Sequence, residues 1–186
     1  MLTESVLQLI NDRQSIGHLV EPAPSQQQIQ QAIGAALAAP DHRRLHPWQF
    51  IQIDHDRRVA FGELIAQCLA KEGEIDPIQL ERVKHHPLRA PLLLICVMKY
   101  QAHAKVPKFE QLLSCGAAIE NLLLVLQAQG FASIWRTGDI AENSYFRQAM
   151  GCDEHDVITG IVYIGTAFKD IPAREPLKVE DFLSHW

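Results

Sequence analysis

The sequence predicts one domain that combines helices with the strands of a β-sheet, and three observations support this. The chain has 186 residues, of which 47% are hydrophobic and 21% charged, as is typical of a globular protein with one core. A continuous apolar run at 91–98 has the length of a strand covered on both faces. Segments with helical spacing of apolar residues flank that run. We find no internal repeat, low-complexity tract or linker, so we expect 1–186 to form one domain.

The first half of the chain alternates helical and extended patterns. Ser25 and Gln28 form a capping-box signature for a helix that runs to about Ala38. Asp76 and Pro77 are typical of the N-cap and first position of a short helix. We therefore expect, in order, a helix from Thr3 to about Asp12 or Arg13, a loop through Pro24, the helix ending near Ala38, a strand at 48–54, a helix through 59–69, and a short helix ending before His86.

The second half is dominated by a long apolar segment at 109–129, followed by Gly130 in the position of a helix C-cap glycine. Because this segment is apolar around much of its circumference, we expect it to be buried on several sides, both in the core and in a subunit interface. The remaining expected elements are the central strand at 91–98, strands at 131–135 and 157–165, a short helix at 144–150, and a C-terminal tail at 166–186.

The segment 35–53 carries the clearest local signal. Pro40 ends a helix of small residues, and the polar stretch from Asp41 to His46 leads through Pro47 into a strand. A short polar loop held between a helix and a strand can present hydrogen-bond donors to a ligand. A charged surface turn is the alternative for this segment alone.

Composition excludes several classes of function. The formal net charge is −5 and the basic residues are scattered, which argues against nucleic-acid binding. The N-terminus lacks the pattern of a signal peptide, and we expect no membrane-spanning segment. The four cysteines form no C-x-x-C pair and are expected to be reduced thiols in the core or on the surface. A cytoplasmic protein is the simplest interpretation.

No motif predicts a metal or a nucleophile. His42 and His46 are four residues apart, but there is no H-E-x-x-H pattern and Pro47 favours an extended His46. We therefore expect no metal site, and a zinc-dependent hydrolase is a remote alternative. His85 and His86 are interpreted as an exposed helix end. The G-x-S-x-G, G-x-G-x-x-G and P-loop patterns are absent.

Three short segments together predict a ligand site. Arg13, Gln14 and Ser15 combine a cation with a carboxamide and a hydroxyl, which suits a phosphate and a polyol chain. His42 follows the second helix. The segment 135–138 leaves a strand with an indole, a guanidinium and a hydroxyl in one turn. Each segment alone is also compatible with a solvated surface.

Five sequence segments, taken in order, resemble the flavin-dependent nitroreductase family, in particular its short, YdjA-type bacterial branch. They are DRQSIGHLVEPAP, AAPDHRRLHPWQF, KVPKFEQ, GFASIWRTG and GIVYIGT, and the similarity extends from Leu9 to about Thr166. The resemblance implies an α+β fold, with a central mixed β-sheet surrounded by helices. It also implies a homodimer with one FMN per subunit at the interface, bound by residues of both chains.

The resemblance also implies the roles of individual residues. Ala38 and His42 match positions that contact the FMN of the other subunit. The other residues implied at the FMN are Arg13, Gln14, Ser15, Trp135, Arg136 and Thr137. The segment implied at NAD(P)H comprises Val125, Leu126, Gln127, Ala128, Gln129 and Gly130.

Two positions depart from the family pattern. Gln14 stands where the family's R-R-S segment has its second arginine, and Ala38 stands where arginine is expected. Both departures remove positive charge from the expected phosphate site. Arg13 and Arg136 are then expected to carry more of the charge compensation.

The function implied is transfer of hydride from NADH or NADPH through FMN to nitroaromatic or quinone-type acceptors, by a ping-pong mechanism. The flavin carries the chemistry, so no catalytic side chain is predicted. The alternative from another class is a flavin-binding sensor or storage protein with little turnover.

Overall fold

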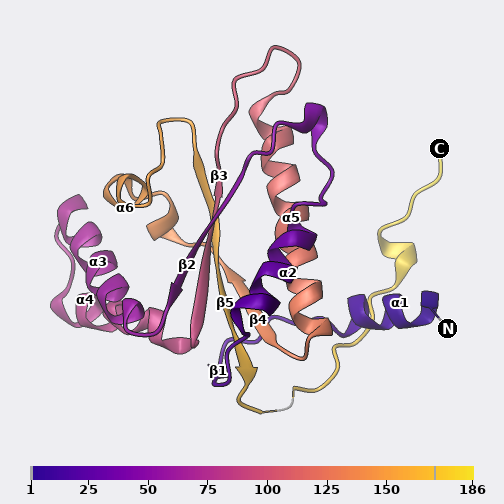
Figure 1. The fold of residues 1–186 in the computed structure, drawn as a ribbon, viewed down its shortest axis with the longest axis horizontal. Helices are drawn as coiled ribbons and strands as arrows, with labels where there is room; N and C mark the ends of the chain where they lie inside the picture. Colours follow the sequence, from indigo (N-terminus) through magenta and orange to yellow (C-terminus); the bar gives the residue numbers. More distant parts are fainter. Residues whose placement is uncertain (1, 170) are drawn as a thin grey trace.

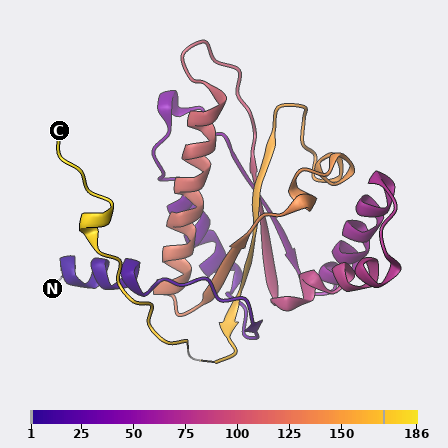
Figure 2. The ribbon, with the colours of Figure 1, turned by 180° about the vertical axis from the view of Figure 1, so that it is seen from behind.

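A β-sheet with helices against both faces forms the body of the molecule (Figures 1 and 2). The computed structural model describes residues 2–169 and 171–186. In chain order the elements are α1 (Leu2–Asp12), β1 (Leu19–Val20), α2 (Gln26–Ala36), η1 (His42–Arg44), β2 (Trp48–Asp54), α3 (Arg57–Glu72), α4 (Pro77–Lys84), η2 (His86–Arg89), β3 (Leu92–Met98), α5 (Lys108–Ala128), β4 (Ala132–Arg136), η3 (Asp139–Ala141), α6 (Ser144–Ala149), β5 (Val157–Ala167) and η4 (Val179–Asp181).

The expected central strand is confirmed. β3 pairs antiparallel with β2 on one edge and with β5 on the other, and all of its residues are buried. β4 and β1 also pair antiparallel with β5. A parallel bridge between Ser15 and Ser133 places the loop after α1 beside β4 and makes the sheet mixed. This bridge brings the loop after α1 to the sheet.

One face of the sheet is covered by α2 and α5 (Figure 1). α2 begins with the expected capping box, in which the Gln28 backbone N–H donates to Ser25 Oγ and the Ser25 N–H donates to Gln28 Oε1. It ends at Ala36, two residues earlier than expected, before the turn that leads to Pro40. The Asn121 side chain donates to the carbonyl of Ala35 and ties α5 to α2. The two helices and the sheet share one apolar core.

The opposite face is covered by α3, α4 and α6 (Figure 2). Phe61 and Phe146 meet in the core between α3 and α6, with ring centres 5.7 Å apart. Gly62 allows the backbone of α3 to approach the carbonyl of Lys84, where a Cβ atom would overlap. Asp76 caps α4 by accepting a hydrogen bond from the Ile78 N–H, as predicted.

α5 has the length and composition of a membrane-spanning helix, contrary to the expectation from sequence that no segment would qualify. Its buried residues, among them Ala118, Leu122 and Leu126, pack on the sheet as part of the core. Its opposite side carries Phe109 and Leu113, which are exposed in the single subunit. The helix is therefore a core helix with one uncovered apolar side, as its sequence predicted.

Two sheet features were not predicted from sequence. The segment expected to be loop after α1 contains β1, in which Leu19 pairs with Ala167 and Val20 with Thr166. β5 consequently extends to Ala167, two residues beyond the expected end of the last strand. A two-residue strand is set by pairing with a distant segment, which leaves no local periodicity in the sequence.

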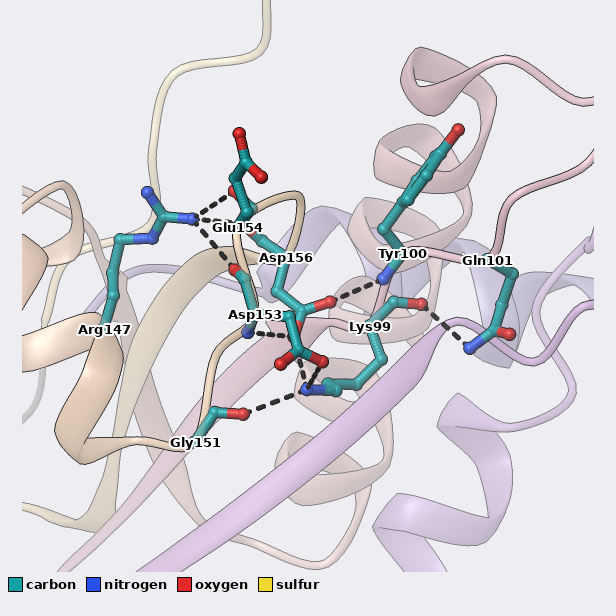
Figure 3. Close-up of polar contacts among 8 residues, drawn as sticks. All are labelled: Lys99, Tyr100, Gln101, Arg147, Gly151, Asp153, Glu154 and Asp156. Carbon is teal, nitrogen blue, oxygen red and sulfur yellow. Dashed lines mark hydrogen bonds and ion pairs between the residues drawn. The ribbon is translucent and has the colours of Figure 1, made fainter.

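A buried ion pair joins the end of β3 to the loop before β5 (Figure 3). Lys99 Nζ donates to the Asp156 carboxylate and to the Gly151 carbonyl. Asp156 also accepts hydrogen bonds from the backbone N–H groups of Tyr100 and Asp153. This carboxylate bonds both to residues that follow β3 and to the loop before β5. It therefore fixes the end of β3 relative to the start of β5.

α1 and the C-terminal tail lie beside each other at one side of the molecule (Figures 1 and 2). The tail is tied to the loop after α1 by the Gln14 side chain, which donates to the Pro172 carbonyl, and by the Phe168 N–H, which donates to the His18 carbonyl. This region exposes many large apolar residues: Val6, Leu7, Ile10, Phe168, Ile171, Leu177, Val179, Phe182, Leu183 and Trp186.

Candidate functional site

The edge of β4 brings two of the three predicted ligand-binding segments together. The Ile16 N–H donates to the Ser133 carbonyl at 3.0 Å, so residues 13–17 run alongside β4. A Cβ atom on Gly17 would lie 3.0 Å from a terminal nitrogen of Arg136. The loop after α1 therefore runs along β4 as far as Arg136, although the two segments are about 120 residues apart in sequence.

Arg13 lies between this edge and α5. Its Nε is 3.3 Å from Glu120 Oε1, and its side chain is largely covered. A guanidinium carries five N–H donors, so one contact through Nε leaves the fork available to a phosphate. Ser15 is exposed beside it. Gln14, by contrast, is tied to the tail through Pro172.

Trp135 is seated on β5 by a local irregularity of the sheet. Its Nε1 donates to the Thr159 carbonyl at 3.0 Å. The register between β3 and β5 shifts at this point, and a Cβ atom on Gly160 would overlap the indole. Such irregularities re-aim side chains, often beside functional sites. The indole is 37% exposed, so part of its surface remains available for contact.

Arg136 lines a cavity of about 580 Å³ on the opposite side of β4 from Trp135. Aliphatic side chains of α3 and β5, including Leu69 and Ile161, form part of its wall, and Thr137 lies at its edge. The Nε atom of Arg136 is buried and has no hydrogen-bond partner among the described residues. A permanent cation that lines a cavity of ligand size indicates a site for a polar or anionic ligand.

Two further basic residues of η2, His86 and Arg89, line the same cavity. Burial lowers the pKa of His86, and the charges of Arg89, Arg82 and Arg136 lower it further. Tyr163 also lines the cavity: burial raises its pKa, while the charges of Arg136 and Arg89 lower it. The other polar lining residues are Gln79, Thr137 and Asp139. The cavity therefore combines two permanent cations and the carboxylate of Asp139 with an imidazole whose lowered pKa favours the neutral form and with a protonated phenol.

The third predicted segment lies elsewhere in the subunit. His42 is in η1, where its Nδ1 is 2.5 Å from Glu110 Oε2 at the start of α5. Arg13 pairs with Glu120, which lies ten residues after Glu110 in α5. The two glutamates are therefore about 15 Å apart along the helix axis. Ala38 is exposed in the turn after α2. Within one subunit, His42 and Ala38 therefore do not meet the β4 edge.

The model of the nitroreductase family matches residues 10–166. The chain belongs to this family. It is 38% identical over 160 residues to the Escherichia coli K12 protein named "Putative NAD(P)H nitroreductase YdjA", a similarity that covers 86% of this chain and 87% of that one.

Two solved structures share the fold of this nitroreductase-family chain. A nitroreductase-like family protein from Bacillus cereus superposes with a TM-score of 0.85 at 17% identity, covering 97% of this chain and 95% of that one. A nitroreductase with bound FMN from Desulfitobacterium hafniense superposes with a TM-score of 0.68 at 20% identity, covering 97% of both chains. The expected α+β nitroreductase-like fold is confirmed.

The segment implied at NAD(P)H ends α5 in this nitroreductase-family chain. The side chain of Leu126 is fully buried, and that of Val125 packs against the same core. Gln127 donates to the Leu9 carbonyl, and Gln129 donates to α2 through the Gln28 carbonyl. These side chains hold neighbouring helices, so a nicotinamide contact with this segment stays a prediction.

The interpretation of His86 as part of an exposed helix end is wrong, because the structure places it in the wall of the cavity. It lies three residues before Arg89, and residues with this spacing in a 3₁₀ turn lie on the same side. The sequence analysis did not identify His86, Arg89 or Tyr163 as residues of a ligand site. The basic i, i+3 spacing just before a buried strand was the available signal, but their approach to Arg136 depends on the tertiary fold.

The two histidines of the 41–46 loop pair with different carboxylates. His42 pairs with Glu110, while His46 Nδ1 lies 3.5 Å from Asp41 Oδ2. The described residues contain no group of three or more His, Cys, Asp or Glu side chains placed to hold a metal ion. Cys115, which faces the Pro47 carbonyl, is a core thiol whose pKa burial raises to about 12.

Proposed function

We propose that this chain is an FMN-dependent NAD(P)H oxidoreductase that reduces nitroaromatic or quinone-type acceptors in the cytoplasm. One observation carries the proposal: Arg136, Arg89 and Thr137 line a cavity of about 580 Å³ at the end of β4. The loop after α1 runs along β4 beside it, with Ser15 bridged to Ser133. The relative named as an NAD(P)H nitroreductase and the FMN-bound structure of the same fold support the choice of reductant and cofactor.

The residues present fit FMN. Arg13 offers a permanent cation and Ser15 a hydroxyl for the phosphate and the ribityl chain. Arg136 and Arg89 place positive charge beside the cavity, which favours the electron-rich oxygen edge of a planar ring. The aliphatic side chains in the cavity wall would exclude water from a ring bound there. When bound, FMN supplies the two-electron redox chemistry between the nicotinamide and the acceptor.

The protein's part in this mechanism is binding, orientation and exclusion of water. We expect the nicotinamide and the acceptor to use one binding space in turn, so each product leaves before the next substrate enters. This order gives ping-pong kinetics. The mechanism requires no acidic or basic side chain dedicated to proton transfer.

The proposed active form is a homodimer with FMN sites shared between subunits. Phe109 and Leu113 on α5 expose large apolar side chains near the pair formed by His42 and Glu110. Exposed apolar patches of this kind mark interaction surfaces. A partner subunit on this surface would cover them and bring its own β4 edge close to His42 and Ala38.

The test is a spectrum followed by a steady-state assay. The purified protein should be yellow, and it should oxidise NADH or NADPH rapidly only when a nitroaromatic or a quinone is added. Parallel lines in double-reciprocal plots at several acceptor concentrations would support the ping-pong order. A yellow protein without acceptor-dependent turnover would instead favour the alternative, a flavin-binding sensor or storage protein. A colourless protein that does not take up FMN contradicts both.

A further inference from the structure

The loop that carries His42 is held in an unusual backbone conformation. Arg43, Arg44 and His46 have φ angles of 67°, 55° and 50°, and none of them is glycine. Such conformations are costly for side-chain-bearing residues and persist only where the surroundings determine them. They gather at functional sites, where the constraint fixes a geometry. Something outside the loop must therefore hold it.

The first half of α5 holds this loop (Figure 1). Glu110 pairs with His42 at 2.5 Å, and Ser114, one helical turn later, donates its hydroxyl to the Pro40 carbonyl at 2.7 Å. Side chains four residues apart lie on the same side of a helix. Within the loop, Asp41 accepts a hydrogen bond from the His46 N–H. The two α5 contacts differ in kind, because Ser114 binds backbone and Glu110 binds an imidazole.

The contact with Glu110 determines which nitrogen of His42 is available. A carboxylate accepts hydrogen bonds, so Nδ1 keeps its proton and donates it to Glu110. The His42 side chain is still 49% exposed, which leaves Nε2 as the ring nitrogen for another group. The exposed apolar residues Phe109 and Leu113 lie on the same end of α5. The ring is therefore oriented at the surface that we assign to the subunit interface.

We propose that Glu110 is a positioning residue, which fixes the ring orientation and the tautomer of His42 so that Nε2 meets the FMN bound by the partner subunit. The inference rests on the proposed function, because it requires that His42 reach a cofactor across the interface. Glu110 itself does not touch the cofactor. A carboxylate that orients an imidazole through one nitrogen commonly sets the hydrogen bonding of the other.

The first experiment measures FMN release from the holoprotein on dilution, by the fluorescence of free FMN. Glu110→Gln and His42→Ala should each raise the FMN dissociation constant by about tenfold, the loss expected for one charge-assisted hydrogen bond. The double variant Glu110→Gln/His42→Ala should be no weaker than His42→Ala alone, because both changes remove the same contact. Ser114→Ala is the matched control: it removes the other loop contact of α5 but keeps the His42–Glu110 pair, so it should weaken FMN binding less than Glu110→Gln does.

The second experiment observes the imidazole directly. Long-range ¹H–¹⁵N spectra of the holoprotein, labelled at histidine, should show a His42 signal that disappears in His42→Ala. Glu110→Gln should change the protonation pattern of this signal, while Ser114→Ala should not. Glu110→Asp keeps the charge on a shorter side chain. Its His42 signal should therefore lie between those of Glu110→Gln and the wild type. Thermal unfolding of each variant checks that its fold is retained.

The outcomes separate the inference from the proposed function. If His42→Ala binds FMN as well as the wild type, the shared site fails at His42 and the inference fails with it. If His42→Ala weakens binding but Glu110→Gln does not, the inference alone is overturned. If Ser114→Ala weakens binding as much as Glu110→Gln, the contact serves only to hold the loop, and the inference is again overturned.

Discussion

The guanidinium of Arg136 lies over the ring of Tyr163, with 5.7 Å between its central carbon and the ring centre. Both residues line the same cavity, and they come from neighbouring strands that pair antiparallel. A cation over an aromatic face is attracted by the ring electrons, and here the arrangement also fixes the plane of the guanidinium. Arg136 is thus oriented before any ligand enters, while its buried Nε remains unpaired.

Arg136→Lys should therefore weaken FMN binding even though it keeps the charge. A lysine cannot reproduce the planar fork or its placement over Tyr163. We expect losses of about 1.5–3 kcal/mol in binding free energy, the range for hydrogen bonds to charged groups. FMN release on dilution measures this. Arg57→Ala, at the exposed start of α3, is the control and should bind FMN normally. A normal dissociation constant for Arg136→Lys would remove Arg136 from the site.

Arg13→Ala should weaken FMN binding more than Gln14→Ala. A charge-assisted phosphate contact is roughly twice as strong as a neutral one, and Gln14 is already bonded to Pro172. Glu120→Gln removes the carboxylate that competes for Arg13, so it should bind FMN at least as well as the wild type. Equal dissociation constants for Arg13→Ala and Gln14→Ala would show that Arg13 is only a helix-end charge.

Leu113→Asp should break the dimer and lower FMN affinity together. Leu113 is 67% exposed on α5 in the single subunit, and a carboxylate there would be costly in an apolar interface. Ile78→Asp is the matched control, because Ile78 is 78% exposed on α4, which covers the opposite face of the sheet. Light scattering and FMN release test both variants. A wild type that is monomeric at micromolar concentration with full FMN content would contradict the shared site.

The order of the helices and long strands was predictable, because each has a local signal. The capping box at Ser25, the proline at position 77 and the buried run at 91–98 all lie where the sequence placed them. β1 was not predictable, because a strand of two residues is too short to show an alternation of apolar and polar side chains. The left-handed residues of η1 were not predictable either, because side chains of α5 rather than glycines hold the loop.

The candidate site was predictable in part. The structure places Ser15 beside Ser133 and Gly17 beside Arg136 at the β4 edge. The shared FMN site that the sequence analysis assigns to these segments stays a prediction. The contribution of His86 was missed, because its surroundings come from strands and helices distant in the sequence. The pairing of His42 with Glu110 likewise spans 68 residues.

Asp156→Asn should destabilise the protein in a pH-dependent manner. Burial alone would raise the pKa of Asp156, but hydrogen bonds from Lys99, Asp153 and Tyr100 outweigh it and lower the pKa below its ordinary value of 3.8. The folded pKa lies below the unfolded one, so the carboxylate stabilises the fold above pH 3.8 and this contribution is lost as the pH falls further.

At neutral pH the loss for Asp156→Asn should be about 1.5–3 kcal/mol, and the difference from the wild type should shrink below pH 3.8. Denaturant unfolding at several pH values measures it. Asp153→Asn is the control, because that side chain is 89% exposed and should change stability by less than about 0.5 kcal/mol. A difference between Asp156→Asn and wild type that is independent of pH would exclude the ion pair as its cause.

Gln14→Arg tests the assignment of the phosphate segment itself. If position 14 faces the phosphate, the added charge should tighten FMN binding by about 1–2 kcal/mol, after the bond to Pro172 is given up. The gain should shrink at higher salt, because exposed charges are screened over about 8–10 Å at ordinary ionic strength. Riboflavin lacks the phosphate and should gain almost nothing. Titrations with both ligands at two salt concentrations decide the matter: equal tightening of both, or of neither, would place Gln14 away from the phosphate and assign its side chain to the tail alone.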